Sequence, residues 1–392
     1  MKKTKIIRVI ARLNIGGPAV HTILLNEGLA KDDFDVSLIT GSPEAYEGDM
    51  AYLAVEKGVE VVFIPELGRS IKLFSDVAAL WKLIRIFKKE KPDIVHTHTA
   101  KAGSLGRAAA VISGVPIKVH SFHGHVFHSY FGPFKTALVV YIERLLALFT
   151  DRIVVVSDII KHDICGRFRI AENEKVSVIR LGLDLDSFRA AEGLKGRLRK
   201  ELNIDKDTIL AGIVGRLTAI KNHSLLFEAI RLIKPGIPAS KIQFLIIGDG
   251  ELRSELEGRC GELGIKEYVR FIGWRRDLPE VYADLDIVVS TSLNEGTPVS
   301  LIEAMASKKA VVSTRVGGVP DLVEDKKTGI LVGSGDPLKL KEAIALLYMD
   351  EPLRKRLGEA GSVSVYERYS KARLVKDMEG LYRGLLLKKG IT

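Results

Sequence analysis

The chain has 392 residues, of which 46% are hydrophobic and 28% are charged, so it can bury large cores, and its length favours about two domains over one. The formal net charge of +10 indicates an anionic partner without locating it. The two cysteines, Cys165 and Cys260, lie far apart and show no metal-ligand spacing. Neither a disulfide framework nor a zinc site is indicated, and a reducing, intracellular setting fits best.

Neither of two apolar stretches in the chain has the features of a signal peptide or of a membrane-spanning helix. Arg8 and Arg12 interrupt the N-terminal apolar run before a signal-peptide core can form, so secretion is not expected. The stretch TALVVYIERLLALF carries Glu143 and Arg144 near its middle and is shorter than the ~20 apolar residues that cross a bilayer. We therefore expect a cytoplasmic protein, either free or associated with the cytoplasmic face of a membrane.

Short β-branched runs alternate with amphipathic helical patterns from the first residues onward. This alternation predicts right-handed βαβ units and a parallel sheet covered by helices on both faces. The elements expected in the first half are strands at 5–11, 35–40, 59–64, 93–98, 117–122, 152–157 and 175–180, and helices at 20–31, 50–57, 77–89 and 134–149.

The charged, Gly-containing stretch 183–206 breaks this alternation, and we interpret it as a linker. The alternation then resumes with strands at 208–215, 241–248, 268–273, 286–291, 309–314 and 328–332. We predict two tandem doubly wound α/β domains, at 1–182 and 207–369. The C-terminal helix at 370–392 has an apolar stripe, which we expect to pack across both domains; it consists of Leu374, Met378, Leu381 and Leu385.

Ligands of open α/β sheets lie beyond the carboxyl ends of the strands, so two facing sheets would form a cleft lined by the loops that follow strands. One such loop is NEGTPVSLIEAM, residues 294–305, which leads from a strand into a helix expected from about Pro298 to Ser307. The helix N-terminus suits a diphosphate. Because carboxylates repel phosphates, Glu295 and Glu303 are expected to accept hydrogen bonds from hydroxyls on either side of it, as a nucleotide sugar would supply. The alternative is that both glutamates are solvated surface charges.

The residues EGTPVSLIEAMA, followed by VVSTRVGGVPDLVEDKKTGILV, resemble the signature of the retaining glycosyltransferases of family four, which have the GT-B fold of two Rossmann-like domains facing across a cleft. The resemblance covers nearly the whole chain. It implies that Glu295 contacts the donor sugar and Glu303 the ribose, with Gly296, Thr297 and Pro298 beside the donor.

The segment GIVGRLTAIKN is similar to the family's Gly-Arg-Leu segment followed by Lys, and its Arg216 and Lys221 can each meet a diphosphate. Asn222 stands where family members usually have Gly, and Asn tolerates a left-handed backbone. In LNIGGPAVHT, Gly16 and Gly17 let the backbone approach a phosphate or acceptor closely. The alternative for each segment is an ordinary turn with surface cations.

Four histidines lie in VHSFHGHVFHSYFG, and His123 matches the family's His-Gly after a central strand. By resemblance, His123 lies near the anomeric centre of the donor, with His125 and His128 as rival candidates. The segment DIVHTHTAKAGSLGRAA also resembles a family pattern. Its candidates for facing an anionic acceptor are Lys101 and Arg107, preceded by His96 and His98, and the alternative is a strand end with solvated charges.

Two further patterns do not indicate cofactors. IIGDGELR has Arg253 where a dinucleotide fingerprint needs its third glycine, which disfavours an NAD enzyme. The Asp-Leu-Asp triplets at 184–186 and 284–286 mimic the metal motif of a different glycosyltransferase fold, but one opens the linker and the other a strand. We expect no metal and no cofactor other than the nucleotide-sugar donor.

The predicted reaction is transfer of a sugar from a nucleotide diphosphate, with UDP favoured, to a hydroxyl of a glycan or lipid-linked acceptor. The resemblance implies retention, generally explained by front-face attack. LWKLIRIFKKEK and HVFHSYFGPFK combine basic and aromatic residues, which suits contact with an anionic membrane surface. The alternative for the first stretch is an amphipathic helix packed on its sheet. No nucleic-acid partner is expected. The rival functions are a sugar-nucleotide epimerase, an inverting transferase and a non-catalytic module that binds a nucleotide or an anionic polymer.

Overall fold

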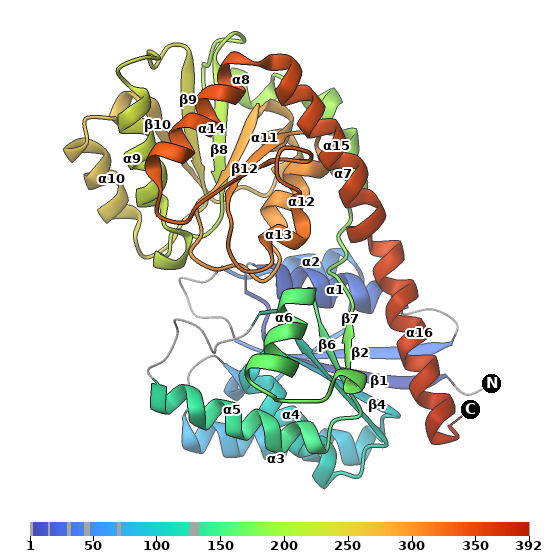
Figure 1. The fold of residues 1–392 in the computed structure, drawn as a ribbon. Coiled ribbons are helices and arrows are strands. Elements are labelled where there is room, and N and C mark those ends of the chain that lie inside the picture. The colour runs from blue at the N-terminus through green and yellow to red at the C-terminus, as the bar shows by residue number, and fades with distance from the viewer. Residues whose placement is uncertain are drawn as a thin grey trace. The chain divides into compact units, whose positions relative to one another are not determined.

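The structure is a computed structural model that describes residues 3–14, 16–29, 33–42, 48–68, 72–124 and 133–391. The chain forms two compact units. The first comprises Met1–Leu183 with Tyr369–Thr392, and the second comprises Asp184–Arg368 (Figure 1). Each unit is an α/β sheet structure of its own.

The first unit contains a parallel sheet in the order β3-β2-β1-β4-β5-β6-β7. Its strands are β1 (Thr4–Arg12), β2 (Phe34–Gly41), β3 (Val61–Phe63), β4 (Ile94–His98), β5 (Ile117–Phe122), β6 (Arg152–Val155) and β7 (Val176–Val178). The strands β2 and β3 lie on one side of β1, and β4 to β7 lie on the other side. The order of the strands therefore reverses between β1 and β4, and a crevice is expected where these two strands end.

Helices cover both faces of this sheet. They are α1 (Gly17–Leu29), α2 (Ala51–Glu56), α3 (Leu73–Glu90), α4 (Ala100–Ile112), α5 (Pro133–Leu148) and α6 (Asp158–His162), with α16 (Lys371–Lys389) from the end of the chain. Alternate residues of β1 point to opposite faces: Ile6 lies in the core formed with α1 and α16, whereas Ile7 lies in the core formed with α3 and α4. No helix is predicted at α4, because its Ala- and Gly-rich sequence has only a weak apolar pattern.

The second unit contains a parallel sheet in the order β10-β9-β8-β11-β12-β13. Its strands are β8 (Ile209–Val214), β9 (Ile242–Ile247), β10 (Val269–Gly273), β11 (Ile287–Ser290), β12 (Ala310–Thr314) and β13 (Ile330–Val332). Its helices are α7 (Asp186–Arg189), α8 (Arg197–Glu201), α9 (His223–Ile233), α10 (Arg253–Glu262), α11 (Leu278–Asp284), α12 (Val299–Ala306), α13 (Val319–Leu322), α14 (Pro337–Met349) and α15 (Glu351–Tyr369). Both sheets have the doubly wound topology expected from the sequence.

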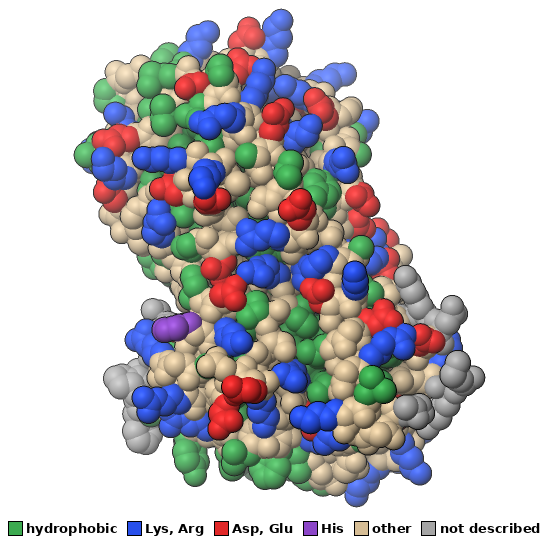
Figure 2. Space-filling view, turned by 45° about the vertical axis from the view of Figure 1, so that its right-hand side comes forward, with side chains coloured by type: hydrophobic (Ala, Val, Ile, Leu, Met, Phe, Trp, Pro, Cys, Tyr) green, Lys and Arg blue, Asp and Glu red, His purple; other side chains and the backbone are tan. Residues whose placement is uncertain are grey.

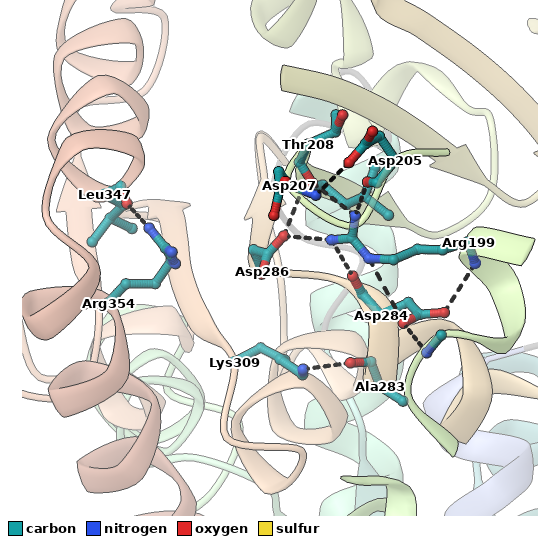
Figure 3. Close-up of polar contacts among 12 residues, drawn as sticks. Arg199, Asp205, Asp207, Thr208, Ala283, Asp284, Asp286, Lys309, Leu347 and Arg354 are labelled. Atoms are coloured by element: carbon teal, nitrogen blue, oxygen red, sulfur yellow. Dashed lines mark hydrogen bonds and ion pairs between the residues drawn. The ribbon is translucent and has the colours of Figure 1, made fainter. Parts of the chain in front are cut away.

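The stretch expected to be a linker, 183–206, is folded onto the second unit. Arg199 is buried and donates to the Asp286 carboxylate at 2.8 Å, and the Asp284 carboxylate accepts from the backbone N–H of Gly196 and of Arg199 (Figure 3). The second Asp-Leu-Asp triplet therefore anchors this stretch. Some of its charged residues form buried ion pairs and others are exposed to solvent. Amino-acid composition alone does not distinguish these two cases.

The C-terminal helix α16 belongs to the first unit. Leu374, Met378, Tyr382 and Leu385 pack into the core that contains Ile6, while Leu381 of the expected stripe is only partly buried. Within the described residues, no helix has the length and apolarity needed to cross a bilayer.

Candidate active site

The loops that follow β8, β11 and β12 meet at the carboxyl edge of the second sheet. Thr291 donates its hydroxyl to the backbone oxygen of Lys221 at 2.9 Å, and Thr314 donates to the backbone oxygen of Ser292 at 2.7 Å. These bonds join three segments that are separate in sequence. They bring the segment that carries Lys221 next to the segment that leads to Glu295.

Lys221 and Glu295 form the central charged pair of this edge. Nζ of Lys221 lies 2.5 Å from Oε1 of Glu295, and the same oxygen accepts from the Ser292 hydroxyl at 2.6 Å. Both donors use Oε1, so among the described residues no hydrogen bond occupies Oε2 of Glu295. That oxygen remains available to accept a hydroxyl.

The backbone of Glu295 is fixed by the loop after β12. Gly318 donates its N–H to the Glu295 carbonyl at 2.8 Å, and Gly317 has a left-handed φ of 48°. A Cβ at Gly317 would lie 2.0 Å from the same carbonyl oxygen. Only glycine satisfies both the backbone angle and the close approach.

Arg216 lies in the loop after β8, which is in close backbone contact with the loop after β9. A Cβ at Gly248 would lie 2.0 Å from the carbonyl oxygen of Gly215, and one at Gly250 would lie 2.6 Å from that of Leu217. The glycines that resemble a dinucleotide fingerprint therefore serve packing between loops. In the part of the chain that the structure describes, no carboxylate pairs with the half-buried Arg216 guanidinium.

Helix α12 begins at Val299, directly after Pro298, which caps it in an extended conformation. The first N–H groups of a helix have no intrahelical acceptor and carry the positive end of its dipole. Gly296 and Thr297 lead into this helix from Glu295. An anion at its N-terminus would therefore meet free backbone donors close to Lys221.

Glu303 lies within α12, where its Oε2 accepts a hydrogen bond from the Tyr282 hydroxyl at 3.1 Å. Burial raises the pKa of Glu303 to about 7, and the hydrogen bond from Tyr282 acts in the opposite direction. Removing this carboxylate from water disfavours its charged form. A donor hydroxyl beside it would favour the charged form again, because a carboxylate is the stronger acceptor.

The first unit carries a separate group of candidates at the carboxyl edge of its own sheet. Gly17 begins α1, the first helix after β1, with Gly16 before it, and His123 follows directly after β5. Nδ1 of His98, the last residue of β4, lies 2.9 Å from Nε2 of His123. The doubly wound topology thus brings these candidates to neighbouring strand ends.

Histidines surround His123. The His21 ring of α1 meets it edge-on at a centroid distance of 4.8 Å, and the His98 ring stacks on it at 5.2 Å. Burial lowers the pKa of His123 to about 4, and burial also lowers the pKa values of His21 and His98. The cluster is therefore neutral at physiological pH, and His123 offers an uncharged imidazole.

Three other candidates of the first unit have structural partners. His96 is buried between the Tyr382 hydroxyl, 2.5 Å from its Nδ1, and the Ser121 hydroxyl. Arg107 is buried and pairs with Glu143 at 2.7 Å, and Lys101 pairs with Asp76 at 2.6 Å. The expectation that Lys101 and Arg107 face an acceptor is therefore wrong, because both cations neutralise acids of their own domain. His125 and His128 lie outside the described residues.

Sequence reasoning missed three contacts of these candidates. Ser292 lies two residues after the end of β11 and three residues before Glu295, a spacing that a turn could have indicated. Tyr282 and His21 gave no signal, because they reach Glu303 and His123 only through tertiary packing.

Two family descriptions match the chain. Glycosyltransferase Family 4 matches residues 15–187, and Glycosyl transferases group 1 matches residues 195–363. The UDP-Gal:alpha-D-GlcNAc-diphosphoundecaprenol alpha-1,3-galactosyltransferase of Escherichia coli is 33% identical over 314 residues, 79% of each chain. The capsular polysaccharide biosynthesis glycosyltransferase CapM of Staphylococcus aureus is 28% identical over 369 residues, 92% of each chain.

Solved structures share the fold. HepE of Anabaena, in complex with UDP, superposes with a TM-score of 0.81 at 20% identity, covering 97% of this chain and 100% of that one. Sucrose-phosphate synthase of Thermosynechococcus elongatus gives a TM-score of 0.82 at 21% identity, covering 98% and 100%. Together with the sequence matches, the two doubly wound units show that the chain is a glycosyltransferase of family 4 with the GT-B fold.

Proposed function

We propose that this protein transfers a sugar from a UDP-sugar to a hydroxyl of a lipid-linked glycan in cell-envelope polysaccharide synthesis, with retention of the anomeric configuration. The Lys221–Glu295 pair at the N-terminus of α12 is the observation that carries the proposal. A cation, backbone N–H groups at a helix start and a carboxylate oxygen without a hydrogen bond among the described residues are the groups that would suit a sugar diphosphate. The Escherichia coli relative named for UDP-Gal and a diphosphoundecaprenol acceptor supports the choice of donor and acceptor.

In the proposed reaction, the bond between the anomeric carbon and the β-phosphate oxygen breaks while a bond to the acceptor oxygen forms on the same face. The acceptor proton passes to the departing phosphate, and UDP leaves. Arg216, Lys221 and the N-terminus of α12 stabilise the negative charge on the leaving diphosphate, which removes the need for a metal ion. Glu303 accepts from the ribose, and Glu295 accepts from a sugar hydroxyl. His123 orients the sugar as a neutral imidazole.

The first test is thermal unfolding with UDP, GDP, ADP and NAD, because a ligand that binds only the folded state raises the apparent stability. We expect a rise with UDP that is lost in Glu303→Ala. Stabilisation by NAD and not by a nucleoside diphosphate would contradict the proposal. Binding of UDP without sugar transfer to any acceptor would favour the non-catalytic module.

The second test measures turnover and product configuration. Lys221→Ala should lower turnover well beyond tenfold, since a charge that acts on the leaving group is lost. Lys355→Ala is a matched control, because Lys355 pairs with Glu351 on an exposed part of α15. Nuclear magnetic resonance of the product distinguishes retention from inversion, and an inverted anomer would exclude the proposed mechanism.

A further inference from the structure

Helix α5 of the first unit presents a row of apolar side chains to solvent and buries an acidic side chain on its inner face. Glu143 is buried and pairs with the equally buried Arg107 at 2.7 Å, with Val140 and Ala147 on the same inner face. The opposite face consists of exposed apolar side chains at helical spacing: Leu138, Tyr141, Ile142, Leu145 and Leu148. Tyr141 is 66% exposed and Leu148 is 72% exposed. A helix covered only by water would have the reverse arrangement.

Helix α3 lies in the same layer, separated from α5 by α4, which contacts both. Its outer stripe has Phe74, Val77 and Trp81 in the first half, and Arg85 and Lys88 in the second. Phe74 is 91% exposed and Trp81 is 59% exposed. We call the outer faces of α3 and α5 the α3/α5 surface. In Figure 2 apolar side chains gather along the lower edge of the molecule, the side on which Figure 1 places these helices, with Lys and Arg beside them.

The charge of this surface is of one sign. Among the described residues of α3, α4 and α5, the acids are Asp76, Glu90 and Glu143, and each is paired with a cation, namely Lys101, Lys5 and Arg107 respectively. Arg85 and Lys88 form no ion pair with a described residue, and the Arg85 guanidinium lies over the Trp81 ring at 5.5 Å. The surface therefore combines exposed apolar groups with uncompensated positive charge.

We propose that the α3/α5 surface docks the protein on an anionic phospholipid bilayer. Apolar side chains with adjacent Lys and Arg bind such an interface by burying apolar area below the headgroups while the cations meet lipid phosphates. A second copy of this chain fits less well, because symmetric pairing would bring the same cations together. The lipid-linked acceptor of the proposed function would lie in the same bilayer. The docking proposal, however, rests on the exposed apolar side chains and the cations of the α3/α5 surface.

The test is co-sedimentation of the full chain with vesicles of phosphatidylglycerol and phosphatidylcholine, without donor or acceptor. At low salt we expect binding that is lost with phosphatidylcholine alone and reduced at high salt. Arg85→Gln and Lys88→Gln should each weaken binding about fivefold. Leu145→Ser combined with Leu148→Ser should weaken it about tenfold or more, since two apolar side chains no longer enter the interface.

The matched control is Met349→Ser combined with Leu387→Ser, which removes exposed apolar side chains from α14 and α16 and should leave vesicle binding unchanged. Because all of these positions are exposed, the variants should fold, which thermal unfolding checks. Failure of the wild type to bind anionic vesicles at low salt, or unchanged binding by the α5 variant, would overturn the proposal. So would a dimer in light scattering that the α5 variant disrupts, since a second copy would then occupy the surface. None of these three results depends on whether the protein transfers sugar.

Discussion

Nδ1 of His98 lies 2.9 Å from Nε2 of His123, which joins the ends of the neighbouring strands β4 and β5. Nδ1 of His123 is buried and has no hydrogen-bond partner among the described residues. If His98 donates its Nδ1–H, His123 carries its own proton on Nδ1, which the proposed function assigns to an oxygen of the donor sugar. Nε2 of His98 is also buried and has no hydrogen-bond partner among the described residues. In this tautomer it carries no proton, and burying an unpaired acceptor costs less free energy than burying an unpaired N–H.

This relationship predicts that His98 acts through His123. His98→Leu should lower kcat about tenfold, the equivalent of one hydrogen bond, with little change in KM for the donor. His98→Asn should recover most of the loss, because its amide can donate from near the position of Nδ1. In a His123→Ala background the His98→Leu change should have no further effect on kcat. Additive losses in that double-mutant cycle would show that the two histidines act independently.

Glycine at position 317 is predicted to be essential for the Glu295 loop. Gly317→Ala adds a Cβ 2.0 Å from the Glu295 carbonyl oxygen at a left-handed φ, so we expect loss of stability and of UDP binding. Gly335→Ala is the matched control, because Gly335 also has a positive φ of 81° but no heavy atom within 4 Å of its added Cβ. Its free energy of unfolding should fall by only about 1 kcal/mol. Its affinity for UDP, measured by calorimetry, should be unchanged. Equal behaviour of the two variants would mean that the close approach is unimportant.

Glu303 predicts a pH dependence of donor binding. Because burial raises its pKa to about 7, a growing fraction of Glu303 is protonated as the pH falls below 7, and the protonated form is the weaker acceptor for a ribose hydroxyl. The affinity for UDP should therefore rise between about pH 6 and pH 8 in the wild type. Glu303→Gln should lose the part of the pH dependence of UDP affinity that comes from Glu303. Ionisation of the diphosphate affects the wild type and the variant equally, so the difference between their pH profiles reports on Glu303. Identical pH profiles in isothermal titration would contradict the proposed role.

The buried histidines predict acid sensitivity of the fold. Burial lowers the pKa of His123 and of His223 from the ordinary value of 6.5 to about 4, so the unfolded chain binds protons more readily than the folded one between these values. Their contribution to stability is full above pH 6.5 and is lost as the pH falls to about 4. His223→Leu should reduce the pH slope of the free energy of unfolding in this range, measured with urea. An unchanged slope would show that His223 already titrates normally in the fold.

Much of the fold follows from local sequence. Apolar runs such as TILAGIVG contain β8, Ile209–Val214, because a strand buried on both faces of its sheet is apolar nearly throughout. Pro298 before Val299 marks the start of α12 for an equally local reason, its fixed φ. The helix α4 and the folding of Arg199 onto Asp284 and Asp286 gave no local signal, since weakly patterned or charged residues are placed there by burial partners far along the chain.

The candidate site divides in the same way. Sequence alone determined the residue types and their order: glycines after the first strand, Arg216 and Lys221 after the first strand of the second unit, and two glutamates around a helix start. Only the tertiary structure decided their partners. It joined Lys221 to Glu295, turned Arg107 inward to Glu143, and so left an apolar face of α5 outward. The reason is that charge pairing and burial depend on distances between segments, which spacing along the chain does not fix.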